Sequence, residues 1–417
     1  MTSDDSGAAA LPTLLSQVLV AFTIEFDNEF EHRMPHRTAA CGPGDSPGGP
    51  WLVSLPMWAN FMQHVDPDGT PMHVLADRAR IVNLGGLQRW GYVRVEAEPG
   101  TDGIVVPTRA GARARTVWAP LAAEIERRWT QRHGDLGPLR ALLVTVLDRL
   151  GPGLPEGLPV VPYADGMRAP RITPATATPT GSASSGPTTA GSTTSGPTAA
   201  GSAPAGSTAA GSTAAGSIAA GPSTSEPTTG TTAPTLPALL SRTLLAFALE
   251  HEARTEVSMT IGATVLRVLD GDVALREVPS RCGVAKEATT AAVNFLQRKG
   301  YVELLPNPAA RGKVVHLTES GRRARDTHSR VRADVERRWR DELGAEDVDA
   351  VRAALRGIVE ARDGGRPLLA AGLVPRPEAW RAQRPYLSAT RAVLADPAAA
   401  LPHHPVVTHR GGYPDGA

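Results

Sequence analysis

The chain has 417 residues and only three lysines, Lys286, Lys299 and Lys313, which fall within one stretch of 28 residues. Lys286 begins a series of polar residues spaced by four, which continues with Thr290, Asn294 and Arg298. Residues four apart lie on one face of a helix. Lysine and arginine bind phosphates and guanine edges, and asparagine pairs with adenine. This spacing therefore predicts a helix with a face that binds nucleic acid.

The charge around this helix is locally positive, although the formal net charge of the whole chain is only +1. Residues 275–340 contain fifteen lysines and arginines against seven aspartates and glutamates. Such a local excess is what contact with phosphates requires. The neighbouring hydroxyl at position 289 and a basic segment after the helix extend the candidate set. The predicted DNA-binding residues are Lys286, Thr289, Thr290, Asn294, Arg298, Arg311 and Lys313.

Four segments of the chain occur twice in the same order. "LPTLLSQVLVAF" at Leu11 returns as "LPALLSRTLLAF", "LQRWGYV" at Leu87 as "LQRKGYV", "TRAGARAR" at Thr108 as "TESGRRAR", and "ERRW" ending at Trp129 recurs unchanged. Ordered repetition of this kind indicates a duplicated module. We refer to residues 1–165 as copy one and residues 236–395 as copy two.

The elements of copy two can be read from its periodicity. Apolar residues at helical spacing predict an opening helix, three shorter helices, and two long helices after "LTES". Between them, "YVELL" and "KVVHLT" predict two short strands around the polar tip "PNPAARG". The expected fold class is mainly α with small β-wings.

Residues 166–235 are dominated by Thr, Ser, Ala, Gly and Pro, with almost no bulky apolar side chain. Ordering such a segment costs entropy without burying apolar surface, so we expect a disordered linker. An O-glycosylated stalk has a similar composition. Residues 396–417 are expected to be a flexible Pro- and His-containing tail.

Two cysteines, an acidic N-terminus and the lack of a long apolar run favour a soluble cytoplasmic protein without membrane contact.

Copy two resembles the MarR family of bacterial transcription regulators over about residues 236–357, through "LQRKGYV", a variable wing and "LTESGRR". The resemblance implies a winged helix-turn-helix and, for the whole chain, two such domains in tandem. It also implies double-stranded DNA as partner, with the helix at 285–299 in the major groove. Relatives pair through their terminal helices, and many respond to a small-molecule effector in a cleft beside the DNA-binding part.

Copy one is expected to keep the fold and to have lost most DNA contacts. With "LQR" aligned to "LQR", Lys286 falls on Asp77, Thr290 on Ile81 and Asn294 on Gly85. Its wing carries acids where copy two has Arg311 and Lys313, namely Glu96, Glu98 and Asp102. The alternative is a shifted register in which Arg78 and Arg80 contact DNA.

Two assemblies follow from the duplication. The first is an intramolecular pseudo-dimer in which the helix near residues 14–26 packs on its counterpart near residues 239–249. The second is a homodimer of chains through their second copies. A tether favours the first, because it raises the effective concentration of the internal partner.

Enzymatic and metal-binding interpretations are weak. No nucleophile motif or phosphate loop is present, and His32, His36 and Cys41 match no strong metal site. His403, His404 and His409 belong to the tail, and Trp51, Met57, Trp58, Phe61 and Met62 are expected in the core. Cys282 is expected to be a buried structural residue rather than an oxidation sensor.

We therefore expect no cofactor, no metal and no catalysis, but sequence-specific DNA binding by a transcription regulator. The alternative is a protein-interaction or ligand-sensing protein built on degenerate winged helices.

Overall fold

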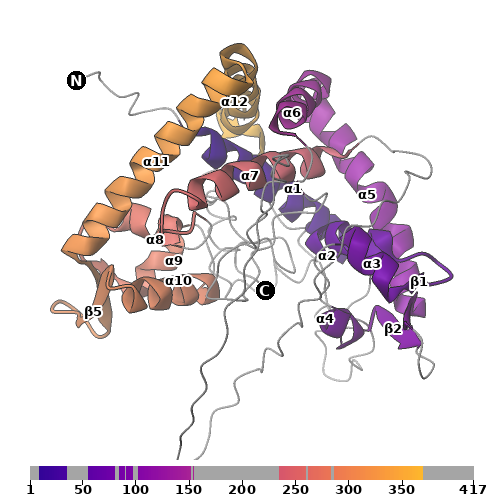
Figure 1. The fold of residues 1–417 in the computed structure, drawn as a ribbon, viewed down its shortest axis with the longest axis horizontal. Coiled ribbons are helices and arrows are strands. Elements are labelled where there is room, and N and C mark those ends of the chain that lie inside the picture. Colours follow the sequence, from indigo (N-terminus) through magenta and orange to yellow (C-terminus); the bar gives the residue numbers. More distant parts are fainter. Residues whose placement is uncertain are drawn as a thin grey trace, which may run out of the picture.

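The computed structural model describes residues 9–34, 55–79, 84–89, 91–96, 102–151, 154, 234–259, 262–282 and 286–369. This part of the chain is mainly helical, with small antiparallel sheets (Figure 1). The expected linker, apart from Pro234 and Thr235, and the expected tail lie outside the described residues. None of the described helices is long and apolar enough to cross a membrane.

Copy one and copy two have the same order of α-helices and β-strands and differ in the position of a short 3₁₀ helix. Copy one consists of α1 (Leu11–Arg33), α2 (Leu55–Asn60), η1 (Met62–His64), β1 (Thr70–Pro71), α3 (Met72–Ala79), α4 (Leu84–Arg89), β2 (Val93–Glu96), β3 (Ile104–Pro107), α5 (Arg109–His133) and α6 (Gly137–Leu150). Copy two consists of α7 (Leu236–Glu252), α8 (Gly262–Val268), β4 (Val273–Ala274), η2 (Leu275–Glu277), α9 (Val278–Cys282), α10 (Lys286–Arg298), β5 (Val302–Pro306), β6 (Lys313–Leu317), α11 (Glu319–Leu343) and α12 (Ala345–Glu360).

Each copy contains one three-stranded sheet, in the order β1-β3-β2 and β4-β6-β5. The two longer strands of copy two lie where the sequence predicts them, and pair from Val302 with Leu317 to Pro306 with Lys313. The third strand of each sheet has only two residues and was not predicted. A separate hairpin, β7 (Arg362–Asp363) with β8 (Arg366–Pro367), follows α12.

The repeated "T-x-x-G" holds the start of each long helix against the turn that precedes the first strand of the hairpin. The side chain of Thr318 accepts from Gly321 N at 3.0 Å and donates to Gly300 O at 2.8 Å. Thr108 makes the equivalent bonds in copy one, at 3.1 and 2.7 Å. A Cβ at Gly321 would overlap the carbonyl oxygen of Tyr301. The glycine is therefore required by this close approach.

The repeated "LQR-GYV" is a helix ending. Gly300 has a φ of 71°, and its N–H bonds to Gln297 O at 3.0 Å. The following N–H, of Tyr301, bonds to Leu296 O at 2.9 Å. Copy one repeats this geometry at Gly91, whose φ is 83°. A left-handed glycine satisfies the last helical carbonyls in this way, so this motif is explained by the scaffold alone.

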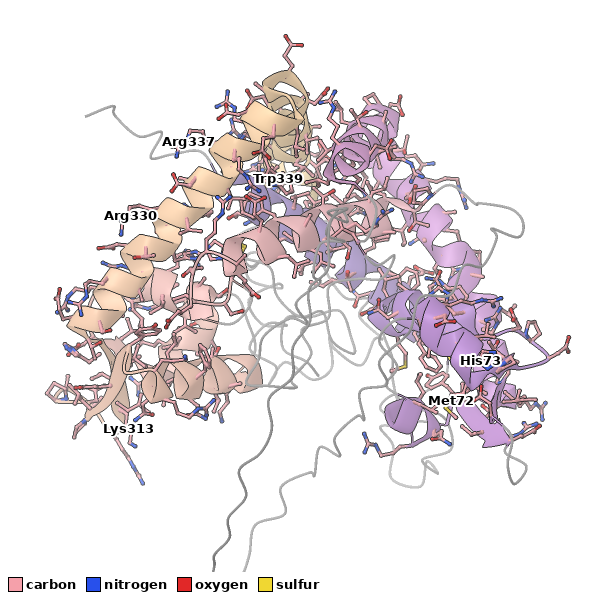
Figure 2. All side chains as sticks on the ribbon, viewed as in Figure 1. Met72, His73, Lys313, Arg330, Arg337 and Trp339 are labelled. Atoms are coloured by element: carbon pink, nitrogen blue, oxygen red, sulfur yellow. The ribbon has the colours of Figure 1, made fainter. Side chains whose placement is uncertain are left out.

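The repeated "ERRW" joins the long helix of each copy to its opening helix. Trp339 Nε1 donates to Glu250 Oε2 at 2.9 Å, and its ring lies edge-on to Phe247 with centroids 5.1 Å apart. In copy one, Trp129 donates to Glu25 at 2.7 Å. Figure 2 shows Trp339 at the junction of the helices, whereas Arg330 and Arg337 lie on the outer side of α11.

The two copies pack against each other within the chain. Helix α1 lies along α7, α6 packs against α7 and α12, and α12 also contacts α1, so these helices join the two arms of an arch (Figure 1). The hydrophobic core is continuous through both copies. Reciprocal bonds mark an approximate two-fold relation, because Arg140 donates to Pro234 O at 2.6 Å and Arg352 to Ala9 O at 3.4 Å. The packing of the two opening helices agrees with the expectation from sequence.

Candidate nucleic-acid interface

Helix α10 has one buried and one exposed face. Ala292, Val293 and Leu296 are buried at 3%, 1% and 0% exposure. The polar series spaced by four is exposed on the other side, and we name it the reading face: Lys286, Thr290, Asn294 and Arg298. The expected separation of core and polar residues is therefore present in the structure.

Thr289 does not belong to this face, and its assignment as a DNA-binding residue is corrected. Its exposure is only 2%, because it precedes Ala292 by three residues and Leu296 by seven, and so falls on the core stripe. Thr290 is exposed, but its hydroxyl donates to the carbonyl oxygen of Lys286 at 2.7 Å. Both observations reduce what the threonines contribute to recognition.

The β5–β6 hairpin places two basic residues near the end of the same arm. Lys313 begins β6, and Arg311 precedes it in the tip; both are exposed. The tip is held by a bond from Asn307 N to Gly312 O of 3.0 Å, and Gly312 has a φ of 123°. Figure 2 shows Lys313 pointing outward from the hairpin. The tip is thus a locally ordered turn rather than an extension of the strands.

The basic side chains of this surface differ from their neighbours in having no counter-charge. Among the described residues, none forms an ion pair or a hydrogen bond with the side chain of Lys286, Arg298, Arg311 or Lys313. In the same copy, charged partners are recorded for Arg254, Arg281, Arg322, Arg323, Arg325, Arg337, Arg338, Arg340 and Arg352. Uncompensated cations in one place provide the charge that an anionic partner would neutralise.

Sequence reasoning missed a further cation of this kind. Arg276 lies on η2, is exposed, and has no partner within the described part of the chain. A three-residue 3₁₀ helix has no periodic sequence pattern, so only the positive charge of Arg276 could have marked this residue as a candidate from sequence. Lys299, just after α10, is exposed as well.

In copy one the counterpart of α10, helix α4, is shorter. The pairing of β1 with β3 and of β4 with β6 makes Thr70 equivalent to Val273, so Ala79 corresponds to Cys282. The shared "LQR" makes Leu84 correspond to Val293. Between these points copy one has four residues, 80–83, where copy two has ten, 283–292. Helix α4 accordingly has only six residues against thirteen in α10.

This corrects the alignment of Lys286 with Asp77. Asp77 lies in α3, which is the counterpart of η2 and α9, so its equivalent is Ser280. Arg78 lies beside it in α3 and pairs with Asp66 at 3.2 Å, as Arg281 approaches Asp270 at 3.9 Å in copy two. Arg80, the other candidate of the shifted register, lies outside the described residues, as does Ile81.

The β2–β3 hairpin of copy one carries charges that are paired with one another or with α3. Arg94 pairs with Glu96 at 2.6 Å. The carboxylate of Asp102 accepts from His73 N at 2.9 Å and contacts the His73 ring, and these hydrogen bonds lower the pKa of the carboxyl group. Glu98 lies outside the described residues. Copy one therefore presents paired charges where copy two presents free cations.

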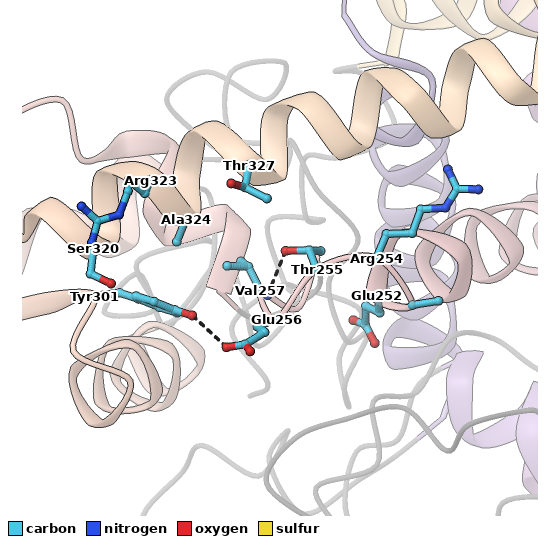
Figure 3. A pocket seen from close by; sticks show the side chains of 11 residues that line it. Glu252, Arg254, Thr255, Glu256, Val257, Tyr301, Ser320, Arg323, Ala324 and Thr327 are labelled. Atoms are coloured by element: carbon cyan, nitrogen blue, oxygen red, sulfur yellow. Dashed lines mark hydrogen bonds between the residues drawn. The ribbon is translucent and has the colours of Figure 1, made fainter.

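A cavity of about 520 Å³ lies in copy two, between the end of α7 and the start of α11 (Figure 3). Its walls are polar, and come from the segment after α7, from the start of α11 and from Tyr301, whose hydroxyl donates to Glu256 Oε2 at 3.3 Å. Burial, followed by the Glu256 charge, raises the pKa of Tyr301. In copy one, Tyr92 is fully buried, with its ring centroid 5.6 Å from that of Trp118. The equivalent tyrosine of copy one is therefore part of an aromatic contact in the core, whereas Tyr301 lines the cavity.

The structure places no metal site in the described part of the chain, where no three His, Cys, Asp or Glu side chains converge. His32 is exposed, while His36, Cys41 and the three histidines of the tail lie outside the described residues. Cys282 is fully buried, and its thiol donates to Thr264 O at 3.4 Å. Burial raises the pKa of this thiol to about 12, so it carries little thiolate at neutral pH.

The aromatic and methionine cluster of copy one is core, as expected. Phe61 and Met62 are buried, and Met57 and Trp58 pack against the core; Trp51 lies outside the described residues.

Comparison of the chain with family models, with characterised proteins and with solved structures gives no significant match.

Proposed function

We propose that the chain is a DNA-binding transcription regulator of MarR type, built from two winged helix-turn-helix modules of which only copy two reads DNA. In this proposal, α9 and α10 are the helix-turn-helix and the β5–β6 hairpin is the wing. The chain acts by binding, without catalysis. Phosphate contacts position α10 in the major groove, and Lys286 and Asn294 contact base edges.

One observation carries the proposal: the reading face and the wing place exposed cations without described partners on one arm of the molecule. The repeated motifs support it less than their number suggests. Thr318, Gly321, Gly300 and Trp339 are all explained by the bonds that they make within the scaffold. The residues that differ between the copies are the better guide to function.

The chain offers a matched pair of residues to test this proposal. Arg298 and Arg89 are the last residues of α10 and α4, and both are exposed. Removing a contact with DNA typically weakens specific binding by about 1–3 kcal/mol, or roughly five- to 150-fold. We expect Arg298→Ala to weaken binding to DNA selected from a random library by the intact chain, and Arg89→Ala to leave it unchanged.

The measurement is fluorescence anisotropy at several salt concentrations. Binding through phosphates falls steeply with salt, and loss of one phosphate contact reduces the slope of log K against log salt by about one. Equal losses for the two variants would remove the asymmetry between the copies. Binding that does not depend on salt would instead favour the alternative, in which the modules dock onto protein.

A small-molecule effector is a second part of the proposal, supported by the cavity of about 520 Å³. Cavities of this size hold small organic ligands. The cavity lies between the segment after α7 and Tyr301, which follows α10. A ligand bound there would change the placement of α10. A thermal-shift screen with the intact chain and with Thr327→Trp, which would fill the cavity, tests this part.

A further inference from the structure

Two histidines of copy two are in direct contact in its interior. His251, in the last turn of α7, is fully buried, and His328, in α11, is 3% exposed. Their ring centroids are 4.6 Å apart and the rings meet edge-on at 69°. The contact joins the opening helix of copy two to the long helix that continues from the β5–β6 hairpin.

The same two positions in copy one are aromatic and do not titrate. His251 corresponds to Phe26, because Glu250 and Glu25 precede them in the equivalent bonds to tryptophan. His328 corresponds to Trp118 by the register of the equivalent N-caps and tryptophans. Trp118 stacks on Phe30 with centroids 4.8 Å apart. One copy therefore closes this junction with apolar rings, and the other closes it with two imidazoles.

The charged groups around the histidines oppose their protonation. Burial is the largest cause, and it lowers the pKa of His251 to about 4 and that of His328 to about 3. The charge of His251 and that of Arg332 of α11 lower the pKa of His328 further. At His251 a hydrogen bond with the backbone of His328 raises the pKa, but burial outweighs it and Arg332 again lowers it. Both imidazoles are consequently neutral in the folded state at physiological pH.

Charged groups on the surrounding helices do not offset the lowered pKa values of the two histidines. From α8, Arg267 adds positive charge near Arg332 and also faces the Cys282 thiol of α9. On α7, the carboxylate of Glu250 is bound by Trp339 and by Arg338, the latter at 2.5 Å. Among the described residues of α1, which also packs on α7, no charged group acts on either histidine.

We propose that the His251–His328 contact is an acid-sensitive latch, which holds α11, the helix that continues from the β5–β6 hairpin, against α7. Opening of this junction exposes both imidazoles to water, where they protonate. Acidification below the ordinary histidine pKa therefore loosens α11, and with it the β5–β6 hairpin, from α7, whereas the aromatic junction of copy one stays closed. The consequence for DNA rests on the proposed function, and the opening itself does not.

The direction and size of the effect follow from proton linkage. A buried histidine with a lowered pKa binds fewer protons in the closed state than in the open state, so closure weakens as pH falls below the ordinary value of about 6.5. Each imidazole then favours opening by about tenfold between pH 7.5 and 5.5, and the pair by about a hundredfold. The weakening continues until the lowered pKa values are reached.

The test is hydrogen exchange of the intact chain at pH 7.5 and 5.5, with rates corrected for the intrinsic effect of pH. We expect peptides from residues 244–257 and 322–335 to lose protection by up to a hundredfold at pH 5.5. Peptides from the equivalent residues 19–32 and 112–125 serve as the control within the same molecule. His251→Phe with His328→Trp, the residues of copy one, should abolish the difference.

A second variant, His251→Gln with His328→Gln, removes the titration without enlarging the side chains, in case the first does not fold. The same pH dependence in the wild type and in a folded double variant would overturn the latch, as would equal loss of protection in copy one. Binding of the selected DNA at both pH values separates the two proposals. A chain that opens at pH 5.5 but binds no DNA at pH 7.5 refutes the proposed function and supports the latch.

Discussion

The guanidinium of Arg149, at the end of α6, lies 2.5 Å from the carboxylate of Asp347, in the first turn of α12. The same guanidinium donates to the carbonyl oxygen of Leu343. These bonds link the last helix of copy one to the last helices of copy two, at the edge of a core that both copies share. A single copy would need a second chain for this contact, and here the chain supplies both copies.

We therefore expect the intact chain to be a monomer in solution. The internal partner has a high effective concentration, and the surfaces of α1 and α7 that would pair with another chain are already covered. Light scattering coupled to gel filtration at micromolar concentration should give a mass near 43.6 kDa. A mass of two chains that persists on dilution would show instead that the second copies pair between molecules.

Residues of the reading face should differ from those of the wing in their effect on specificity. Lys286→Ala and Asn294→Ala should each weaken binding to the selected site by roughly 1–3 kcal/mol and relax the preference for particular bases. Arg311→Ala should weaken binding to all sequences about equally, because a contact with the phosphate backbone carries no sequence information. Competition with mismatched duplexes measures both effects. Unaltered binding of both helix variants would place the contact on another surface.

The elements of copy two could be predicted because their signals are periodic or local. The strands at "YVELL" and "KVVHLT", and the polar face of α10, came directly from alternation and from spacing by four. Thr289 was assigned wrongly because the core stripe of a helix is wide, and a residue next to an exposed one can lie on its border. The strands β1 and β4 have two residues each, which is too short for any pattern.

The correspondence between the copies could be predicted only in part. Alignment by motif fixes the ends of α4 and α10, but the six residues that copy one lacks fall between two matching segments. Only the pairing of β1 with β3 and of β4 with β6 shows that Asp77 precedes the gap. The contact between His251 and His328 joins residues 77 positions apart, so no local pattern could reveal it.

The stability of the scaffold should depend sharply on Gly321 and hardly at all on Gly357. A methyl group at Gly321 would overlap the carbonyl oxygen of Tyr301, which is backbone and cannot rotate away. We expect Gly321→Ala to lower the free energy of unfolding by about 1–3 kcal/mol or more, as at other overpacked sites.

Gly357 provides the control, because it lies inside α12 with open space around its Cα. Gly357→Ala should raise the free energy of unfolding by up to about 1 kcal/mol, since alanine is the better helix former. Urea unfolding followed by circular dichroism compares the two variants. Equal stability of the two alanine variants would mean that the approach of Gly321 to Tyr301 relaxes at little cost.

The DNA site itself should be asymmetric. A symmetric dimer presents two identical reading helices and selects a palindrome, with half-sites about one helical turn apart. In this chain α4 has six residues and paired charges beside it, whereas α10 has thirteen residues and uncompensated cations. One chain should therefore specify bases over a single half-site, with contacts from copy one limited to the backbone. Selection from a random duplex library with the intact chain, followed by sequencing, will measure this. Enrichment of one conserved block without an inverted partner is the expected outcome. An enriched palindrome, together with a two-chain complex on the DNA, would contradict the asymmetric site, because the second copies of two chains would then read the two half-sites.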